Sequence, residues 1–393
     1  MSGDRQRARA RDLGLAPGSL PAGPANAITD VPGIRVGHAT MIDGTDVRTG
    51  VTAVVHDDLL PAGAPDEGQR GSGSGKLPAG LSVFNGFGKM VGSTQVAELG
   101  TIETPVLLTG TLSVFRVADA LLSYLRERHG GDPPGTLNPV VAETNDGYLS
   151  DIWARPVTAE HVRIALDTAA AGPVAEGCVG AGTGTGALGF KAGIGTSSRV
   201  VSLTTGSVTL GVLVQANFGG TLTVLGVPVP ATEQQPRGGN SCVIVLATDA
   251  ALDSRHLERL ASRSFAGMAR AGSDFSGRSG DYALAISVTR PVSAAQREPA
   301  AAPITATREA AASRPAGAGS GTAAPGQAAA TAGYLVPGKD LDLLFQAAIE
   351  ATEEAILNSV FMAVTTSGYH GHVRHAVSLD DVLARVTSRL TTS

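Results

Sequence analysis

A serine, Ser241, follows a loop of small residues and directly precedes a buried-strand run at residues 242–247. The loop ends in Gly238, Gly239 and Asn240. A hydroxyl in this position can attack the preceding carbonyl, and hydrolysis of the resulting ester makes Ser241 a new chain start. The freed α-amine, with a reference pKa of about 8, can act as a base at neutral pH. The pattern therefore indicates self-cleavage between Asn240 and Ser241, although a serine after a turn is usually a plain turn residue.

Strand-like runs lie on both sides of this junction, with helical patterns outside them. The runs before the junction predict a meander of antiparallel strands, and those after it predict further strands. Three segments have helical spacing, and the last of them is strongly amphipathic. The expected strands are 51–55, 200–203, 208–215, 221–229, 242–247 and 282–289, and the expected helices are 113–128, 250–271 and 340–363. This order favours an α+β fold with two stacked sheets covered by helices over an alternating parallel fold.

Composition bounds the kind of protein. The chain has 393 residues and a hydrophobic fraction of 42%, enough for a sizeable core. A net charge of −5 without a basic block makes nucleic acid an unlikely partner. The sequence has no apolar stretch long enough to span a bilayer, so we expect no membrane association. Two cysteines, Cys178 and Cys242, form neither a disulfide framework nor a zinc motif, which favours reduced thiols and a cytoplasmic location.

The ends of the chain and one internal segment differ in composition from the rest. Residues 1–25 are rich in Ala, Gly, Pro and Arg and predict a disordered tail. Residues 293–332 are rich in Ala, Pro, Gly, Ser and Thr and predict a disordered insertion. We therefore expect one catalytic domain over 26–375, followed by a C-terminal tail over 376–393.

Several motifs in order resemble the aminopeptidase family that includes the L-aminopeptidase/D-esterase/amidases and the β-aminopeptidases. The residues that carry the resemblance are 28–38 (ITDVPGIRVGH), 140–149 (VVAETNDGYL), 180–184 (GAGTG), 211–217 (GVLVQAN), the Asn240–Ser241 pair and 348–362. The resemblance covers about residue 25 to about residue 375. It implies a self-cleaved αββα four-layer sandwich, like that of the ornithine acetyltransferases, with an α chain (1–240) and a β chain (241–393). It also implies small peptide or amide substrates, no metal or organic cofactor, and a homo-oligomer of processed α/β pairs.

The resemblance also implies roles for individual residues. Ser241 would be the nucleophile for self-cleavage and turnover, and Ser279 and Asp281 would support it. A spacing of two at a strand start puts Ser279 and Asp281 on one face. Family members often have Glu at the position of Asp281, and Asp is one methylene shorter. Asn217 would donate its amide to an oxyanion hole, and Tyr148 would help to stabilise the same charge. Taken singly, each of these residues also fits a turn, a hairpin or the core.

An aminopeptidase must also recognise the substrate ammonium, and a carboxylate is the group that does so. Glu143 and Asp146 flank Tyr148 in sequence and are the candidates.

Two other motifs carry less weight. The glycines at 184, 186 and 189 match a dinucleotide fingerprint, but no helix or suitably spaced acidic residue follows them. They fit close packing near the active site better. His370, His372 and His375 have metal-like spacing but also fit a solvated C-terminal segment.

Two other functions are considered beside the aminopeptidase. An acyltransferase of the ornithine acetyltransferase type shares the architecture but matures at a threonine, whereas this chain has Ser241. An unprocessed homologue that binds ligands without catalysis would remain a single species of 39.5 kDa.

Overall fold

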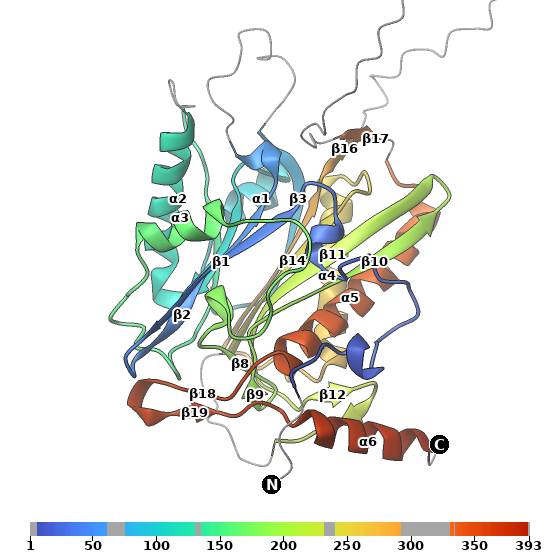
Figure 1. Cartoon of the computed structure of the whole chain (residues 1–393). Helices are drawn as coiled ribbons and strands as arrows, with labels where there is room; N and C mark the ends of the chain where they lie inside the picture. The colour runs from blue at the N-terminus through green and yellow to red at the C-terminus, as the bar shows by residue number, and fades with distance from the viewer. Residues whose placement is uncertain are drawn as a thin grey trace, which may run out of the picture.

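The computed structural model describes residues 6–60, 75–129, 135–231, 240–291, 331–333 and 335–391. These residues form two large mixed sheets with helices packed against them (Figure 1). The predicted α+β class is confirmed. The loop at 232–239 and residues 293–330 of the predicted insertion lie outside the described residues.

The first sheet has the strand order β1-β2-β6-β7-β4. Its strands are β1 (Arg35–Asp43), β2 (Val47–Val55), β6 (Val106–Gly110), β7 (Val140–Thr144) and β4 (Met90–Val91). β6 and β7 are parallel, and the connection between them contains α2 (Val114–His129). Apolar residues of α2 and α3 (Ala159–Asp167) form one core cluster with strands of this sheet.

The second sheet carries the predicted cleavage site and has the order β10-β11-β14-β15-β3-β5. Its strands are β10 (Ile194–Leu203), β11 (Gly206–Asn217), β14 (Asn240–Thr248), β15 (Ser279–Ser287), β3 (Leu77–Gly86) and β5 (Thr101–Ile102). β14 is antiparallel to β11 and parallel to β15. The crossover from β14 to β15 is α4 (Ser254–Arg270), because parallel neighbours need a long connection.

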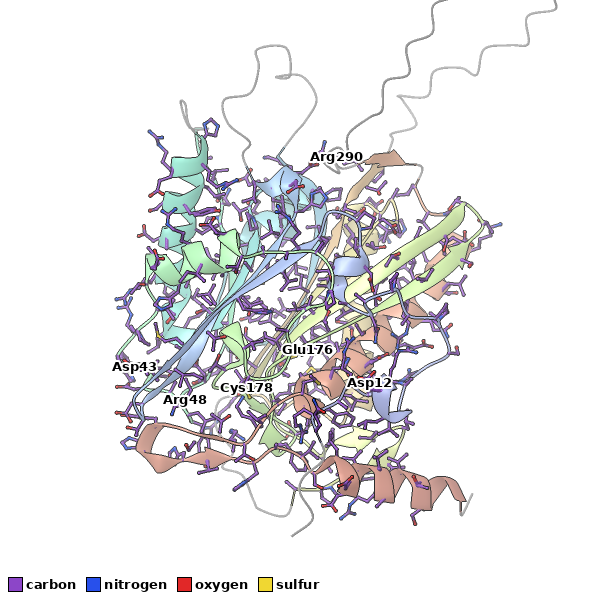
Figure 2. The ribbon with its side chains drawn as sticks, viewed as in Figure 1. Asp12, Asp43, Arg48, Glu176, Cys178 and Arg290 are labelled. Atoms are coloured by element: carbon purple, nitrogen blue, oxygen red, sulfur yellow. The ribbon has the colours of Figure 1, made fainter. Side chains whose placement is uncertain are left out.

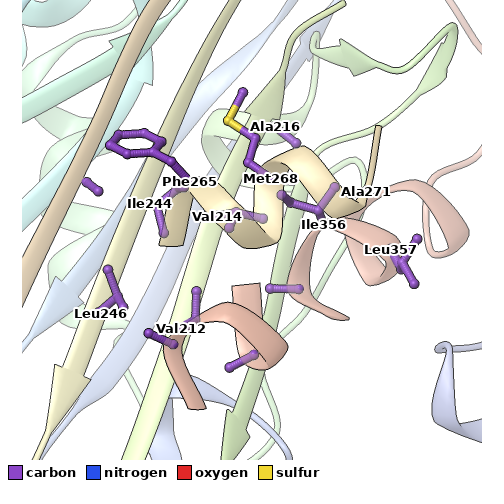
Figure 3. Packing of buried hydrophobic residues seen from close by; sticks show 14 of the residues in the cluster. Val212, Val214, Ala216, Ile244, Leu246, Phe265, Met268, Ala271, Ile356 and Leu357 are labelled. Atoms are coloured by element: carbon purple, nitrogen blue, oxygen red, sulfur yellow. The ribbon is translucent and has the colours of Figure 1, made fainter. Parts of the chain in front are cut away.

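Side chains alternate between the two faces of the second sheet. On one face, Ile244 and Leu246 of β14 pack with Phe265 of α4 and Ile356 of α5 (Leu341–Phe361), as Figure 3 shows. On the other face, Val243 and its alternate neighbours pack in a cluster shared with the first sheet. Side chains fill the space between the sheets (Figure 2).

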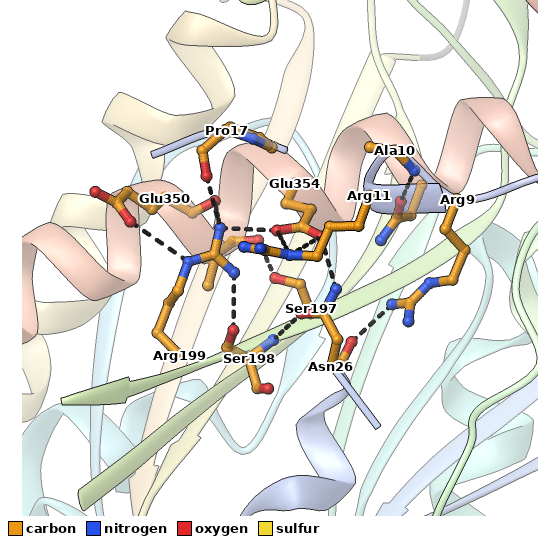
Figure 4. A network of polar contacts seen from close by, with 12 residues as sticks. Arg9, Ala10, Arg11, Pro17, Asn26, Ser197, Ser198, Arg199, Glu350 and Glu354 are labelled. Atoms are coloured by element: carbon orange, nitrogen blue, oxygen red, sulfur yellow. Dashed lines mark hydrogen bonds and ion pairs between the residues drawn. The ribbon is translucent and has the colours of Figure 1, made fainter. Parts of the chain in front are cut away.

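Helix α5 differs from its prediction. Its bounds agree with the expected 340–363, but it is buried nearly all round instead of having an exposed polar face. Two buried glutamates of this helix bind Arg199, which is itself 0% exposed: Glu354 at 2.8 Å and Glu350 at 3.4 Å (Figure 4). Polar residues in the helical pattern thus form internal ion pairs where a solvated face was expected.

Residues 6–25, predicted as a disordered tail, are packed against the core. Ala10 is fully buried, and its N–H donates to Asn358 Oδ1 of α5 at 2.9 Å. Arg9 binds Glu176 at 2.7 Å, and Arg11 binds Glu354 at 2.9 Å. Alternating arginines that satisfy buried carboxylates therefore explain the order of this segment, which composition alone did not indicate.

The C-terminal segment also differs from the expected tail. It contains α6 (Leu379–Thr391), in which Leu379, Val382 and Val386 are buried. The hairpin β18 (Thr366–Ser367) and β19 (Val373–Arg374) precedes this helix.

Two further expectations are corrected. The third strand of the meander, at 221–229, is a small separate ribbon of β12 (Thr223–Val224) and β13 (Val227–Pro228), and β14 takes its place beside β11. At the end of the predicted insertion, β17 (Thr331–Gly333) pairs with β16 (Thr289–Pro291).

Short elements complete the described part of the chain. They are α1 (Ser93–Leu99), β8 (Gly186–Ala187) and β9 (Phe190–Lys191). Within the described residues, no helix is both long and apolar enough to cross a membrane.

Candidate active site

Ser241 is the second residue of β14 and lies between two neighbouring strands. Its partner on β11 is Asn217, and its partner on β15 is Gly280. The side chain is 2% exposed, and Oγ accepts a hydrogen bond from the Gly280 N–H at 3.3 Å. The buried β-branched run that follows the serine forms the strand that fixes this position.

Ser279 and Asp281 form a hydrogen-bonded pair at the start of β15. Ser279 Oγ donates to Asp281 Oδ1 at 2.6 Å, and both side chains are buried. The shorter Asp side chain therefore reaches Ser279. Burial raises the pKa of Asp281, and the hydrogen bonds from Ser279 and Asn85 oppose this rise.

The serine and the Ser279–Asp281 pair lie on different faces of the second sheet. The Ser241 side chain lies on the same face as Val243, two residues along β14, which packs between the sheets. The Asp281 side chain lies on the same face as Ala283 of β15, which packs toward the helices. The predicted line of three side chains is thus only partly formed: Ser279 and Asp281 are joined, and the Oγ of Ser241 contacts Gly280. The backbone of Ser241 runs in the sheet between these two faces.

Asn217 ends β11 directly beside Ser241. Its Oδ1 accepts from the Gly186 N–H at 3.1 Å, and its Nδ2 donates to the Asn145 carbonyl at 2.8 Å. These two contacts fix which way the amide points. The predicted oxyanion donor is therefore adjacent to the serine and rigidly held.

Tyr148 lies in the turn after β7, where the C-terminal hairpin holds its ring. The His372 ring stacks on it at 4.3 Å between centroids and 3° between planes, and the Arg374 guanidinium lies 4.5 Å from the ring centroid. Arg374 also packs against Gly186, where an added Cβ would lie 2.3 Å from the arginine Cδ. Arg374 therefore contacts both the Tyr148 ring and Gly186, and the Gly186 N–H binds Asn217. Tyr148 is connected to Asn217 through these two residues.

The histidines with metal-like spacing serve other contacts. The His370 and His372 rings lie 6.0 Å apart, and the His375 carbonyl accepts from the Lys191 N–H at 2.7 Å. The described residues contain no group of three or more His, Cys, Asp or Glu side chains that could hold a metal ion.

Glu143 lies at the end of β7, close to the strand partner of Ser241. A Cβ added to Gly88 would lie 3.1 Å from Glu143 Oε1, and one added to Gly280 would lie 2.9 Å from Gly88 Cα. Oε1 accepts from the Lys89 N–H at 3.0 Å, and Lys89 Nζ lies 3.7 Å away. The other oxygen, Oε2, is buried. Burial raises the pKa of this side chain, and the charge of Lys89 and a hydrogen bond with Thr111 oppose the rise.

Asp146 is more deeply enclosed than Glu143. Added Cβ atoms at Gly110 and Gly184 would lie 2.6 Å and 3.0 Å from its side chain. Burial raises its pKa to about 7, opposed by a hydrogen bond with Thr49, and the charge of Glu143 raises it further. The two predicted carboxylates are therefore close enough to interact, but Glu143 is the one beside Gly88 and Gly280.

Two residues at the site escaped the sequence analysis. Asn85 donates to Asp281 Oδ2 at 2.8 Å, and Lys89 contacts Glu143. An asparagine inside a strand pattern is unusual, so Asn85 offered a signal. Lys89 is the next residue after the Asn-Gly-Phe-Gly run that begins at Asn85.

The sequence matches a known peptidase family. The model of peptidase family S58 matches residues 26–374, nearly the whole described chain. This chain belongs to peptidase family S58. The match includes every candidate site residue, from Glu143 to Asp281.

Relatives within the S58 family have aminopeptidase names. The β-peptidyl aminopeptidase BapA of Sphingosinicella microcystinivorans is 37% identical over 393 residues, which cover 93% of this chain and 88% of the relative. A Burkholderia sp. β-aminopeptidase is similar in structure, with a TM-score of 0.75, 35% identity and coverage of 98% and 99% of the two chains.

A third relative links the fold to a known class. The L-aminopeptidase D-Ala-esterase/amidase of Ochrobactrum anthropi, described as a new variant of the Ntn hydrolase fold, has a TM-score of 0.78 and 33% identity. It covers 97% of this chain and 99% of its own. The family and its relatives support aminopeptidase activity, and they favour neither the acyltransferase nor the binding-protein alternative.

Proposed function

We propose that this S58 member is a self-processing serine aminopeptidase with Ser241 as its nucleophile. The observation that carries the proposal is the position of Ser241: a buried hydroxyl at the start of an internal strand, beside the Asn217 amide and next to the Ser279–Asp281 pair. Cleavage of the Asn240–Ser241 bond by this hydroxyl would give an α chain (1–240) and a β chain (241–393) of one catalytic domain. Packing of α2 and α3 on the first sheet and of α4 and α5 on the second supports an αββα four-layer sandwich.

The new amine of Ser241 gives the Ser279–Asp281 pair its function. Because the amine nitrogen lies in the plane of the sheet, it is accessible from the face that carries Ser279. The amine takes the proton of Ser241 Oγ as the hydroxyl attacks the substrate carbonyl, and Ser279 and Asp281 stabilise the charged amine. The proton then goes to the leaving amine, and water hydrolyses the Ser241 ester.

The negative charge of the tetrahedral intermediate needs donors. Asn217, the strand partner of Ser241, would supply one through Nδ2, and Tyr148 would support the same charge. Such donors stabilise the charge best when they are held in place before the reaction. The contacts of the Asn217 amide with Gly186 and Asn145 would hold it in this way.

The substrate ammonium binds to Glu143 in this proposal. Oε1 accepts from the Lys89 N–H, so the ammonium would bind at Oε2, on the side of the carboxyl away from that N–H. Asp146, enclosed behind Gly110 and Gly184, supports the negative potential of the site without direct contact. The names of the relatives favour peptides and amides with an N-terminal β-amino acid residue.

The protein would act in the cytoplasm as a homo-oligomer of processed pairs. Both cysteines, Cys178 and Cys242, are free thiols, which fits a reducing compartment.

Intact mass and N-terminal sequencing of purified protein test the proposal. We expect two fragments, the smaller beginning at Ser241, and a single 39.5 kDa species for Ser241→Ala. A Ser241→Ala chain that is still cut, or still releases amino acids from peptides, contradicts the proposal. Addition of an amine acceptor distinguishes the acyltransferase, which would form acylated acceptor in place of free acid.

A further inference from the structure

A one-residue bulge in β3 lies directly opposite Asp281. Asp281 pairs with Asn85, but the next residue, Tyr282, pairs with Val83, so Phe84 is an extra residue on β3. Such bulges can turn two successive side chains toward the same face of a sheet, and they are frequent beside active sites. In this strand the two successive residues are Phe84 and Asn85.

The contacts of both residues agree with a shared face. The Phe84 ring lies 5.4 Å from the ring of Phe265 in α4 and 4.4 Å from that of Phe275. Asn85 Nδ2 donates to Asp281 Oδ2 at 2.8 Å, on the same side of the sheet. Without the extra residue, strict alternation would turn Asn85 toward the first sheet and away from Asp281.

Three donors bind the carboxylate of Asp281: the Ser279 hydroxyl, the Asn85 amide and the backbone N–H of Cys242. Oδ1 accepts from Ser279 and Oδ2 from Asn85, so the plane of the carboxylate is fixed. The same Asn85 nitrogen lies 3.4 Å and 3.5 Å from the carbonyl oxygens of Phe275 and Ser276, which sets the orientation of the amide.

We propose that Asn85 is a positioning residue that acts through Asp281, holding its carboxylate ionised and aimed at Ser279. The proposal rests on the roles of Ser279 and Asp281 in the proposed function. An N–H donor stabilises a carboxylate over the neutral acid, so Asn85 offsets the burial of Asp281.

Three other titratable groups act on or near this carboxylate. Asp274, in the loop before β15, opposes ionisation of Asp281. Cys242 of β14 and Tyr282 of β15 are neutral at neutral pH because burial raises the pKa of both. Asn85 therefore works against both burial and the charge of Asp274.

The test is the pH dependence of kcat/KM for processed protein in Asn85→Ala and Asn85→Asp. Loss of the donor should move the acidic limb upward by about one pH unit, with little change in KM. Asn85→Asp should move the limb further, because it places a like charge beside Asp281. Phe84→Ala is the matched control: it removes the neighbouring side chain of the same bulge and should lower thermal stability without moving the limb.

Two further measurements test whether Asn85 acts through Asp281. Asn85→Ala should change nothing further in an Asp281→Asn background, and full additivity there contradicts the proposal. Carbon-13 titration of the Asp281 carboxyl reads the contact without catalysis: a pKa unchanged in Asn85→Ala, or in the milder Asn85→Ser, overturns it. If Asn85→Ala shifts the pKa of Asp281 but the wild-type chain neither cleaves itself nor hydrolyses peptides, only the proposed function is contradicted.

Discussion

Ser279 Oγ lies 2.6 Å from Asp281 Oδ1, across a pleat of β15 and one residue to either side of the strand partner of Ser241. The pair therefore lies beside the start of β14, where a cut would leave a new amine, but on the face opposite the Ser241 hydroxyl.

Ser279→Ala should slow peptide hydrolysis by the processed protein about 10²-fold, because it removes the contact between the amine and Asp281. Asp281→Asn should have a similar effect. The rate is followed by release of the chromogenic amine from an amide substrate. The conservative Asp281→Glu should retain most activity, and equal losses in Asp281→Glu and Asp281→Asn would contradict a role for the charge.

Asn217→Ala should reduce kcat by about 10²- to 10³-fold with a small change in KM, since an oxyanion donor acts mainly in the transition state. Steady-state kinetics on purified, processed protein measures it. Asn145→Ala serves as a control, because the Asn217 contact is to the Asn145 backbone carbonyl and survives this change. A rise in KM alone for Asn217→Ala would refute the oxyanion role.

Glu143→Gln should raise KM at least tenfold for substrates with a free N-terminal ammonium, because Oε2 loses its charge. Asp146→Asn should raise KM less, since its side chain is enclosed behind glycines. The comparison uses two forms of one amide substrate, the first with a free amino group and the second with that group acetylated. If neither variant raises KM for the free amine, the ammonium site lies elsewhere.

The stability of the protein should depend on Asp146 in a direction set by its pKa. Burial raises the pKa of Asp146 from 3.8 to about 7, so the folded chain holds this proton more tightly than the unfolded chain. Between about pH 4 and pH 7, this group therefore lowers stability as the pH rises. Asp146→Asn should match the parent near pH 4 and be more stable at pH 8, by at most on the order of 4 kcal/mol.

Urea unfolding at pH 4.5 and pH 8, in a Ser241→Ala background, measures this difference. An Asp146→Asn variant that is destabilised equally at both pH values would show that its charge is not what matters.

Arg199→Leu should destabilise the protein by about 3–5 kcal/mol, because it leaves Glu350 and Glu354 buried without this partner. Arg163→Ala is the control, since Arg163 and Glu127 form an exposed pair whose loss should not be measurable. Thermal unfolding of both variants decides: a similar melting temperature for the two would contradict the importance of the buried cluster.

Local patterns in the sequence predicted much of the second sheet and part of the site. The β-branched run after Ser241 specified a buried strand, and the spacing of two placed Ser279 and Asp281 on one face, as their hydrogen bond confirms. The ends of α2, α4 and α5 agree with the expected helices to within a few residues.

Long-range contacts account for what was not predicted. The N-terminal arginines are ordered by glutamates that lie more than 160 residues further along the chain. One of these arginines, Arg11, pairs with Glu354 of α5 and so helps to keep that polar residue buried. Asn85 reaches Asp281 only because of a bulge, which shifts the alternation that sequence reasoning assumes to be regular. None of these partners is visible from composition or periodicity.

The place of β14 in its sheet has a consequence for the protein after a cut. β11 and β15 lie on its two sides and already pair with its first residues. A break at the beginning of such a strand exposes no unpaired edge onto which another molecule could add a strand. The chain could thus be divided in two without becoming prone to aggregation.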